Sequence, residues 1–115
     1  MGGGQTLTAA FAMPDKFACI AVFSSGLGVG GGGGRGGTGW EDAHKGVLDN
    51  AQLKQGIKPI WMSTGRDDGL ITNSRATVDI LKRHGFNPVF LESPGAHTWI
   101  NWRDYLGQFA PQLFR

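Results

Sequence analysis

The stretch Pro59-Ile-Trp-Met-Ser-Thr-Gly-Arg-Asp-Asp-Gly-Leu-Ile71 decides the fold, because a short apolar run leads directly into a glycine turn that carries two aspartates. The run is typical of a β-strand that leaves the core at Gly65. Residues 17–23 and 88–92 are two further apolar runs of strand length. The run at residues 17–23 is near-continuous, which indicates a strand that is covered on both faces. We therefore expect three strands.

Segments with the pattern of helices surround these strands. They are residues 2–12, residues 42–55, a segment from Asn73 or Ser74 to His84, and residues 99–109. Pro14 and Gly56 end the first two, since proline cannot continue a helix and glycine is common directly after one. Asn73 or Ser74 is expected to cap the third. Alternating helices and strands predict an α/β fold of about three parallel strands, with right-handed crossovers and helices on both faces of the sheet.

The length and composition predict one domain over residues 1–115, with a low-complexity loop at residues 26–39. Ten of the fourteen residues in that loop are glycine, whose backbone freedom opposes a fixed structure. The formal net charge is +2, with lysine and arginine scattered between acidic residues, so we expect no nucleic-acid partner. Cys19 is the single cysteine, which rules out an intrachain disulfide and fits a small core residue.

The first residues lack the basic and apolar regions of a signal peptide. No apolar stretch approaches the roughly 20 residues that a membrane span needs. We expect a cytoplasmic chain without membrane association as the sequence is written. A secreted protein is the alternative if residues are missing before Met1.

Two loops carry the residues with the clearest catalytic chemistry. Asp67 and Asp68 follow the strand at residues 59–65, and His97 follows the strand at residues 88–92. The carboxyl ends of parallel strands meet at one edge of a sheet, where ligands bind in folds of this kind. An acid followed by a histidine is the order of the last two triad members in α/β-hydrolases. There the acid orients the imidazole, which takes a proton from serine.

Several sequence motifs occur together in one known family. They are Met1-Gly-Gly-Gly-Gln5, Pro14-Asp-Lys-Phe17, Phe23-Ser-Ser25, Gly65-Arg-Asp-Asp-Gly-Leu-Ile71, Gly95-Ala-His-Thr-Trp99 and Trp102. The chain resembles the C-terminal half of the esterase D-like and feruloyl esterase group, carbohydrate esterase family 1 of the α/β-hydrolase superfamily. The nucleophile elbow of that family commonly reads Gly-x-Ser-Met-Gly-Gly-Gly-Gln. Where the family normally has Gly-Gly-His, this chain has Gly95-Ala-His97.

The resemblance implies a serine carboxylic ester hydrolase that forms an acyl-enzyme and uses no cofactor. It places the catalytic acid on Asp68, with Asp67 as the competing acid, and the catalytic histidine on His97. The residue after the nucleophile supplies a backbone N–H to the oxyanion hole, and that residue is Met1, provided that the chain extends upstream. The serine itself would directly precede Met1. In the family an insertion often shapes the acyl or leaving-group pocket, and here the glycine run and Trp40 hold that place.

No serine within the sequence replaces this nucleophile, because none stands in Gly-x-Ser-x-Gly. The serines that could have served as a nucleophile are Ser24, Ser25, Ser63, Ser74 and Ser93. We therefore expect an esterase fragment that is inactive alone and whose intact form acts on a small-molecule or carbohydrate-linked ester. The sequence leaves feruloyl, acetyl and S-formylglutathione-type esters open. The alternative is a non-catalytic α/β module, stabilised by self-association through the exposed strand edge at residues 17–23 or by a complementary N-terminal half.

Other patterns favour structural interpretations. Residues 26–31 match G-x-G-x-x-G, but more glycine follows instead of a helix that could hold a pyrophosphate. The histidines and the cysteine lack the spacing of a metal site, so we expect no metal and interpret His44 and His84 as structural or surface residues. Trp99 and Trp102 begin an aromatic stripe that we expect to pack on the sheet, with contact to an aryl or sugar group as the alternative. The stripe continues through Tyr105, Leu106 and Phe109.

Overall fold

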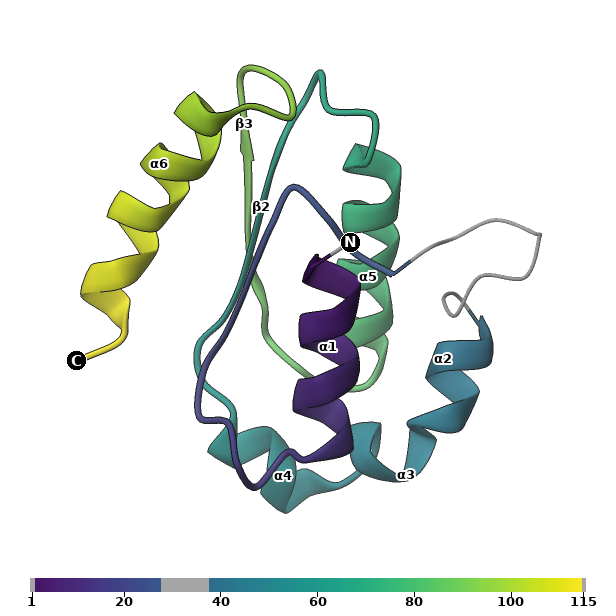
Figure 1. The fold of residues 1–115 in the computed structure, drawn as a ribbon. Helices are drawn as coiled ribbons and strands as arrows, with labels where there is room; N and C mark the ends of the chain where they lie inside the picture. The colour runs from purple at the N-terminus through teal and green to yellow at the C-terminus, as the bar shows by residue number, and fades with distance from the viewer. Residues whose placement is uncertain (1, 28–37, 115) are drawn as a thin grey trace.

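Three parallel strands form the centre of the computed structural model, which describes residues 2–27 and 38–114 (Figure 1). They are β1 (Ile20–Phe23), β2 (Ile60–Gly65) and β3 (Val89–Ser93), in the order β1-β2-β3. Ile20 lies opposite Ile60, and Trp61 lies opposite Val89. Every residue of β2 is buried, because this strand has a neighbour on each side and helices over both faces. The predicted α/β class with three parallel strands is confirmed.

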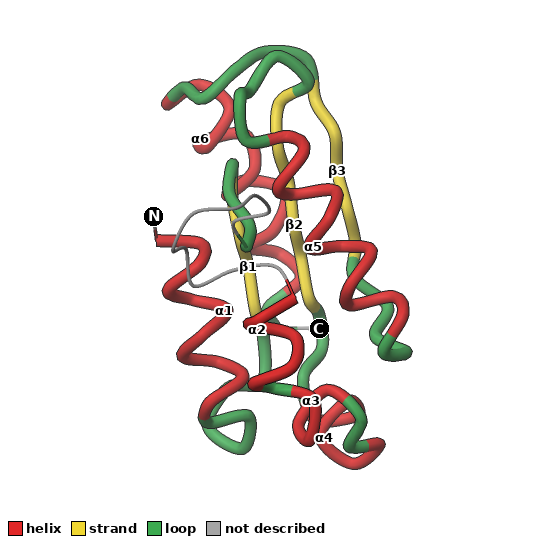
Figure 2. The backbone as a smooth tube through the Cα atoms, turned by 90° about the vertical axis from the view of Figure 1, so that its right-hand side faces the viewer, coloured by secondary structure: helices red, strands yellow, loops and turns green. Residues whose placement is uncertain are grey.

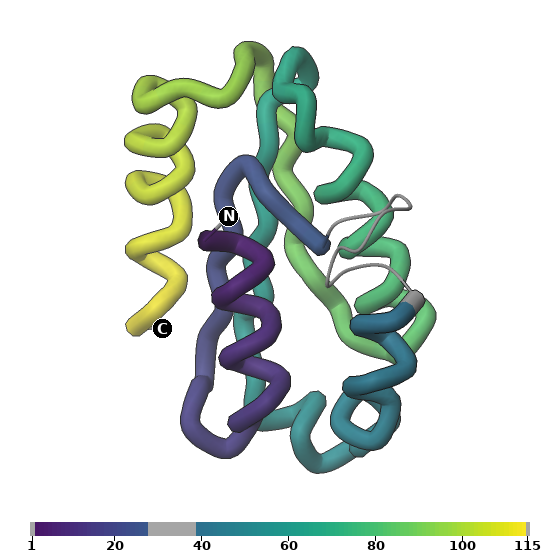
Figure 3. The backbone as a smooth tube through the Cα atoms, turned by 45° about the vertical axis from the view of Figure 1, so that its right-hand side comes forward, coloured from purple at the N-terminus to yellow at the C-terminus, as the bar shows by residue number. Residues whose placement is uncertain are grey.

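Helices cover both faces of this sheet, as predicted (Figure 1, Figure 2). One face carries α1 (Gly2–Ala12) and α5 (Ile71–Arg83), and the other carries α6 (Trp99–Phe109), which continues into the 3-10 helix η1 (Ala110–Gln112). Three short helices precede β2: α2 (Thr38–Ala43), α3 (Lys45–Leu48) and α4 (Ala51–Gly56). Figure 3 shows α6 separated from α1 and α5 by the strands. Among the residues that the structure describes, no helix has the length and apolar character of a membrane span.

The helix predicted at residues 42–55 is divided into short helices. Asn50 has an extended backbone, with φ −81° and ψ 111°. Its side chain accepts hydrogen bonds from the backbone N–H groups of Gln52 (3.0 Å) and Leu53 (3.3 Å). An asparagine side chain used in this way competes with the helical ladder, so a new helix begins after Asn50. Asn50 thus accounts for the break between α3 and α4, a further break lies at His44, and the prediction of one continuous helix was wrong.

The third helix also begins earlier than predicted. α5 starts at Ile71, so Asn73 and Ser74 lie inside its first turns and do not cap it. The Ser74 hydroxyl donates to the carbonyl oxygen of Ser25 at 2.7 Å and lies 2.7 Å from the hydroxyl of Thr64. This buried serine therefore ties α5 to β2 and to the segment that follows β1.

The apolar layer between the sheet and α1 and α5 forms the main core. Phe11, Met62 and Leu81 are fully buried in it. Trp40 is 4% exposed and meets Phe11 edge-on, with 5.5 Å between ring centroids. Trp40, which stands where the family's insertion often shapes a pocket, is therefore a core residue in this chain.

The apolar layer beneath α6 is narrower than the predicted aromatic stripe. Tyr105 is fully buried and Phe109 nearly so, and both rings meet the ring of Phe23, at centroid distances of 5.8 and 6.3 Å. Trp99 and Leu106, in contrast, are 80% and 54% exposed. Trp99 and Leu106 are seven residues apart, so they share one side of α6, and that side faces solvent. Tyr105 and Phe109 are four residues apart and share the side that faces the sheet. The prediction that Trp99 and Leu106 pack on the sheet was wrong.

β1 is shorter than predicted and lies at an edge of the sheet. Residues 17–19 fall outside the strand, where Phe17 is exposed and Cys19 is half-buried. Within the described part of the chain, β1 pairs with β2 alone. One row of its backbone N–H and C=O groups therefore has no strand partner there. Most of the predicted loop at residues 26–39 lies outside the described residues.

His84 joins two parts of the chain at the end of α5. Its Nδ1 lies 2.8 Å from an Asp49 carboxylate oxygen, and its Nε2 lies 2.7 Å from a Glu41 carboxylate oxygen. A neutral imidazole has one N–H, so only the imidazolium can donate to both carboxylates. The hydrogen bonds to Asp49 and Glu41 accordingly raise the pKa of His84 above its usual 6.5. The same bonds lower the pKa values of the Glu41 and Asp49 carboxyls from their usual 4.5 and 3.8.

This cluster predicts a pH-dependent contribution to stability. The raised pKa of His84 means that its contribution is complete below pH 6.5 and is lost as the pH rises through the raised value. The lowered pKa values of the two carboxyls mean that their contribution is complete above pH 4.5 and is lost as the pH falls. The free energy of unfolding of the wild type should therefore exceed that of His84→Gln most between pH 4.5 and pH 6.5. Urea unfolding across this range measures the difference, and a difference that is independent of pH would contradict the interpretation.

Candidate active site

Asp68 lies in the turn between β2 and α5 and is the buried acid of the site. Its backbone N–H donates to the carbonyl oxygen of Gly65 at 3.1 Å. Its carboxylate Oδ1 accepts from the backbone N–H of Leu70 at 2.9 Å. The side chain is 1% exposed and precedes the first turn of α5, whose N-terminal end favours negative charge. One carboxylate oxygen is thereby held in place, and the other faces the next loop.

His97 lies in the loop between β3 and α6 and meets this carboxylate. Its Nδ1 is 2.9 Å from Asp68 Oδ2, and 51% of its side chain is exposed. Asp67 has an exposed side chain, and its backbone N–H donates to the Gly95 carbonyl oxygen at 3.0 Å. The structure thus brings Asp68 to His97 and leaves the Asp67 carboxylate in solvent. Because an ionised carboxylate only accepts hydrogen bonds, Nδ1 is the donor and Nε2 of the neutral ring can accept a proton.

Two glycines allow the acid loop and the histidine loop to approach closely. A Cβ on Gly65 would overlap the carbonyl oxygen of Gly95. Gly95 itself has φ +96°, a conformation that other residues rarely adopt. The backbone N–H of Arg66 donates to the Ser93 carbonyl oxygen at 2.9 Å across the same gap. The glycines of the two motifs therefore set the spacing between the acid and the histidine.

Residues of α6 hold the histidine loop against the sheet. The Asn101 amide donates to the Pro94 carbonyl oxygen at 2.8 Å and to the Ser93 hydroxyl at 3.1 Å, and its oxygen accepts from the Thr98 hydroxyl at 2.8 Å. The fully buried Tyr105 places its hydroxyl 2.6 Å from the Ser93 hydroxyl. Sequence reasoning missed this network. The available signal was the set of polar residues at the start of the helix that follows the loop with the candidate histidine.

Trp102 and Ser24 complete the surroundings of the imidazole. The rings of His97 and Trp102 meet edge-on, with 5.0 Å between centroids and an angle of 88°. The indole Nε1 of Trp102 donates to the Ser24 hydroxyl at 2.9 Å. Ser24 directly follows β1, is 1% exposed and has φ +51°, which is uncommon for a residue other than glycine. No local sequence signal predicts this contact, since the two residues are 78 positions apart.

Most of the serines within the sequence that could have served as a nucleophile are buried. Four of them are at most 7% exposed: Ser24, Ser25, Ser63 and Ser74. The hydroxyl of the fifth, Ser93, is engaged by Tyr105 and Asn101. Met1, for which the resemblance implies an oxyanion N–H, lies outside the described residues. In the part of the chain that the structure describes, no group of three or more His, Cys, Asp or Glu residues is placed to hold a metal ion.

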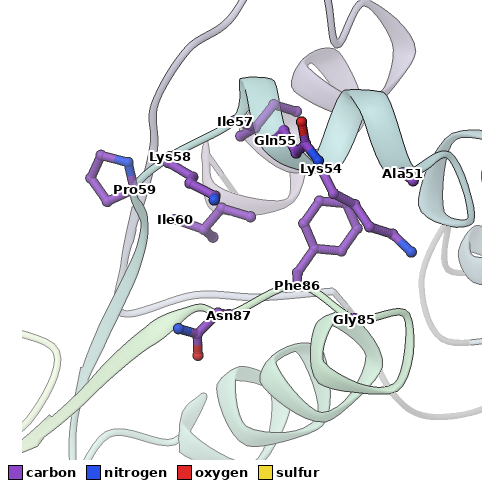
Figure 4. Close-up of a pocket in the computed structure, with 10 residues that line it drawn as sticks. All are labelled: Ala51, Lys54, Gln55, Ile57, Lys58, Pro59, Ile60, Gly85, Phe86 and Asn87. Atoms are coloured by element: carbon purple, nitrogen blue, oxygen red, sulfur yellow. The ribbon is translucent and has the colours of Figure 1, made fainter.

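A cavity of about 530 Å³ lies at the other end of the sheet (Figure 4). Residues from α4 to the start of β2 and residues that join α5 to β3 line it, among them Lys54, Lys58 and Phe86. The Lys54 ammonium is 5.7 Å from the centre of the Phe86 ring, a cation–π distance. Asp68 and His97 follow the opposite, carboxyl ends of β2 and β3, so this cavity is not part of their site.

No family model matches the chain. An acetyl esterase from Caldicellulosiruptor saccharolyticus is 38% identical over 55 residues, which cover 48% of this chain and 21% of that protein. A solved ferulic acid esterase has a TM-score of 0.67 and 18% identity, over 96% of this chain and 47% of that one. An S-formylglutathione hydrolase from Staphylococcus aureus has a TM-score of 0.67 and 22% identity, over 97% of this chain and 47% of that one. The chain thus has the fold of esterases of the α/β-hydrolase type over about half the length of these solved structures.

The close approach of the two loops predicts the effect of a single methyl group. Gly65→Ala should push the loops apart, because the added Cβ would overlap the Gly95 carbonyl oxygen. We expect the free energy of unfolding to fall by about 1–3 kcal/mol, the usual cost of overpacking. Gly69→Ala is the matched control, since a Cβ at Gly69 meets open space. Urea unfolding of both variants measures the effect, and equal stability losses would contradict the steric explanation.

Proposed function

We propose that this chain, which has the fold of α/β-hydrolase esterases over about half of their length, supplies the acid and the histidine of a serine carboxylic ester hydrolase. The observation that carries the proposal is the 2.9 Å contact between Asp68 Oδ2 and His97 Nδ1, which joins a buried carboxylate to a half-exposed imidazole. The two residues follow neighbouring parallel strands, in the chain order of the triad acid and histidine of α/β-hydrolases. The names of the matched proteins support the same class of reaction.

The geometry suits general-base catalysis by the imidazole. Asp68, with one oxygen held by the Leu70 N–H, orients the ring of His97 and stabilises its protonated form. Nε2 of His97 removes the proton of a serine hydroxyl as the serine oxygen attacks the ester carbonyl carbon, and it then gives that proton to the leaving alcohol. Water repeats the sequence on the acyl-enzyme and releases the acid. These steps need no cofactor.

In this proposal the nucleophilic serine directly precedes Met1, as in Gly-x-Ser-Met-Gly-Gly-Gly-Gln, and the backbone N–H of Met1 contributes to the oxyanion hole. The start of α1 at Gly2 supports this placement, because an elbow serine stands at a turn between a strand and a helix. The position of Gly3 supports it too. A Cβ there would overlap the side chain of Ser25, so α1 begins beside the carboxyl end of β1, on the edge of the sheet that carries His97.

The proposed substrate is a small-molecule or carbohydrate-linked ester with a feruloyl or acetyl group. Aromatic surface close to His97 supports contact with an aryl or sugar group. Trp99 is 80% exposed and meets Trp102 edge-on, with 5.1 Å between ring centroids, and Trp102 in turn meets His97. Exposed aromatic rings of this kind offer a flat apolar surface to planar ligands.

A second candidate function follows from the edge of the sheet. The outer side of β1 has no strand partner within residues 2–27 and 38–114, and an unpaired edge can pair with another chain. The chain would then be a non-catalytic α/β module, completed by a second copy or by a complementary N-terminal half. A defined oligomer in size-exclusion chromatography supports this alternative, and a well-folded monomer counts against it.

The 115-residue chain alone should hydrolyse p-nitrophenyl acetate no faster than its His97→Ala variant. The reason is that an acid–histidine pair without its serine cannot form the acyl-enzyme. A colorimetric assay of both proteins at equal concentration measures this. A rate that depends on His97 would mean that a nucleophile lies within these residues.

The DNA upstream of Met1 should continue the reading frame and encode Gly-x-Ser immediately before it. In the protein extended in this way, Asp68→Asn should lower kcat by about 10³- to 10⁴-fold, because an amide in place of the carboxylate stabilises the wrong tautomer of the imidazole. Asp67→Asn is the matched control and should leave kcat unchanged, since its carboxylate is in solvent. An in-frame stop codon directly before Met1 would contradict the placement of the serine, and the reverse ranking of the two variants would make Asp67 the acid.

A further inference from the structure

We propose that Ser24 and Trp102 form a clamp that fixes the orientation of the His97 imidazole. The inference rests on the proposed function, because it assigns two positioning residues to the same site. Its basis is that the segments after all three strands converge on one imidazole, two of them directly and the third through the indole of Trp102. Asp68 follows β2 and binds the imidazole directly, His97 follows β3 and carries it, and Ser24 follows β1 and holds the indole beside it.

The imidazole needs a second restraint. Half of the His97 side chain is exposed, so solvent leaves room for other rotamers. The hydrogen bond to Asp68 restrains Nδ1 while it is formed, but a single bond on a half-exposed side chain opens at times and then lets χ1 and χ2 change. A base that removes a serine proton has to keep Nε2 directed at one position in space. A rigid neighbour in contact with the ring would supply that restraint.

Trp102 has the position that such a neighbour requires. It lies one turn into α6, where its backbone N–H donates to the Thr98 carbonyl oxygen at 3.2 Å. Its ring meets that of His97 at 88°, with 5.0 Å between centroids, the edge-on geometry in which aromatic rings attract each other. An indole in this place blocks rotation of the imidazole toward that side.

Ser24 fixes the indole in turn. Its hydroxyl accepts the hydrogen bond from Trp102 Nε1 at 2.9 Å, and its backbone N–H continues the β1–β2 ladder by donating to the Ser63 carbonyl oxygen at 2.7 Å. The hydroxyl is therefore carried by the sheet itself. Ser24 also has φ +51°, a conformation that costs free energy for a residue with a side chain. Backbone strain of this kind is concentrated at functional sites, and here it belongs to the residue that anchors the indole.

A purely structural explanation competes with this one. The bond between Ser24 and Trp102 could serve only to hold α6 on the sheet and to satisfy a half-buried indole N–H. Under that explanation, breaking the bond lowers stability and leaves the order of the imidazole unchanged. A measurement on the His97 ring itself therefore separates the two explanations.

The test uses NMR of the 115-residue chain with labelled histidine. Ring-nitrogen shifts of His97 report its tautomer, and side-chain couplings report its rotamer. Trp102→Phe keeps an aromatic ring but removes the N–H, and Ser24→Gly removes the hydroxyl while tolerating the positive φ. Trp99→Phe is the matched control, because it makes the same chemical change on an exposed indole that meets Trp102.

We expect a single His97 rotamer in the wild type and in Trp99→Phe, and averaged couplings in Trp102→Phe and Ser24→Gly. If Ser24→Gly does not fold, Trp102→Phe decides alone. Wild-type couplings in Trp102→Phe overturn the proposal, and so does equal averaging in Trp99→Phe. In the protein extended upstream of Met1, Trp102→Phe should lower kcat about 10- to 100-fold with KM unchanged. Failure of the proposed function looks different, because it gives an ordered imidazole in the wild type but no hydrolysis that depends on His97 in the protein extended upstream of Met1.

Discussion

The close approach of two backbones, at Gly65 after β2 and at Gly95 after β3, is the constraint on which the site depends. Adjacent parallel strands direct their following loops to one edge of the sheet, but loops with side chains at these two positions would be held apart. Without Cβ atoms the loops exchange backbone hydrogen bonds, from Arg66 to Ser93 and from Asp67 to Gly95. That contact brings the carboxylate of one loop within hydrogen-bond distance of the imidazole of the other.

The two titratable groups of the site, the Asp68 carboxylate and the His97 imidazole, differ in their exposure to solvent. The Asp68 carboxylate is almost completely removed from solvent, and its desolvation is offset by the Leu70 N–H, by the Nδ1–H of His97 and by the N-terminal end of α5. The His97 ring stays half exposed, so a reacting group can reach Nε2. Under the proposed function, a fixed carboxylate behind an accessible imidazole suits proton transfer to and from a substrate.

The order of helices and strands could be predicted from the sequence, because apolar runs and glycine or proline breaks are local signals. The division of residues 42–55 was missed because the Asn50 side chain competes with the helical ladder only when the chain turns there. Serine is a residue type that often caps helices. The hydroxyl of Ser74 instead donates to the carbonyl oxygen of Ser25, which is a tertiary contact.

The acid and histidine loops could be located from their order along the chain, but the sequence left Asp67 and Asp68 as competitors. Which of two adjacent carboxylates turns inward depends on the turn at Gly65, and that turn is fixed by the neighbouring loop. Trp99 and Trp102 were likewise equivalent in the sequence. Their difference arises from the partner that β1 offers to one indole, a contact between residues far apart in the chain.

The cluster of His84, Asp49 and Glu41 couples folding of the chain to proton binding. Both ring nitrogens face carboxylates, which raise the pKa of His84, so the folded chain binds a hydrogen ion there more strongly than the unfolded chain does. Near neutrality the unfolded chain has largely released this ion, because the usual pKa of the imidazole is 6.5. Folding then withdraws hydrogen ions from the medium, and the heat of folding includes the ionisation heat of whichever buffer supplies them.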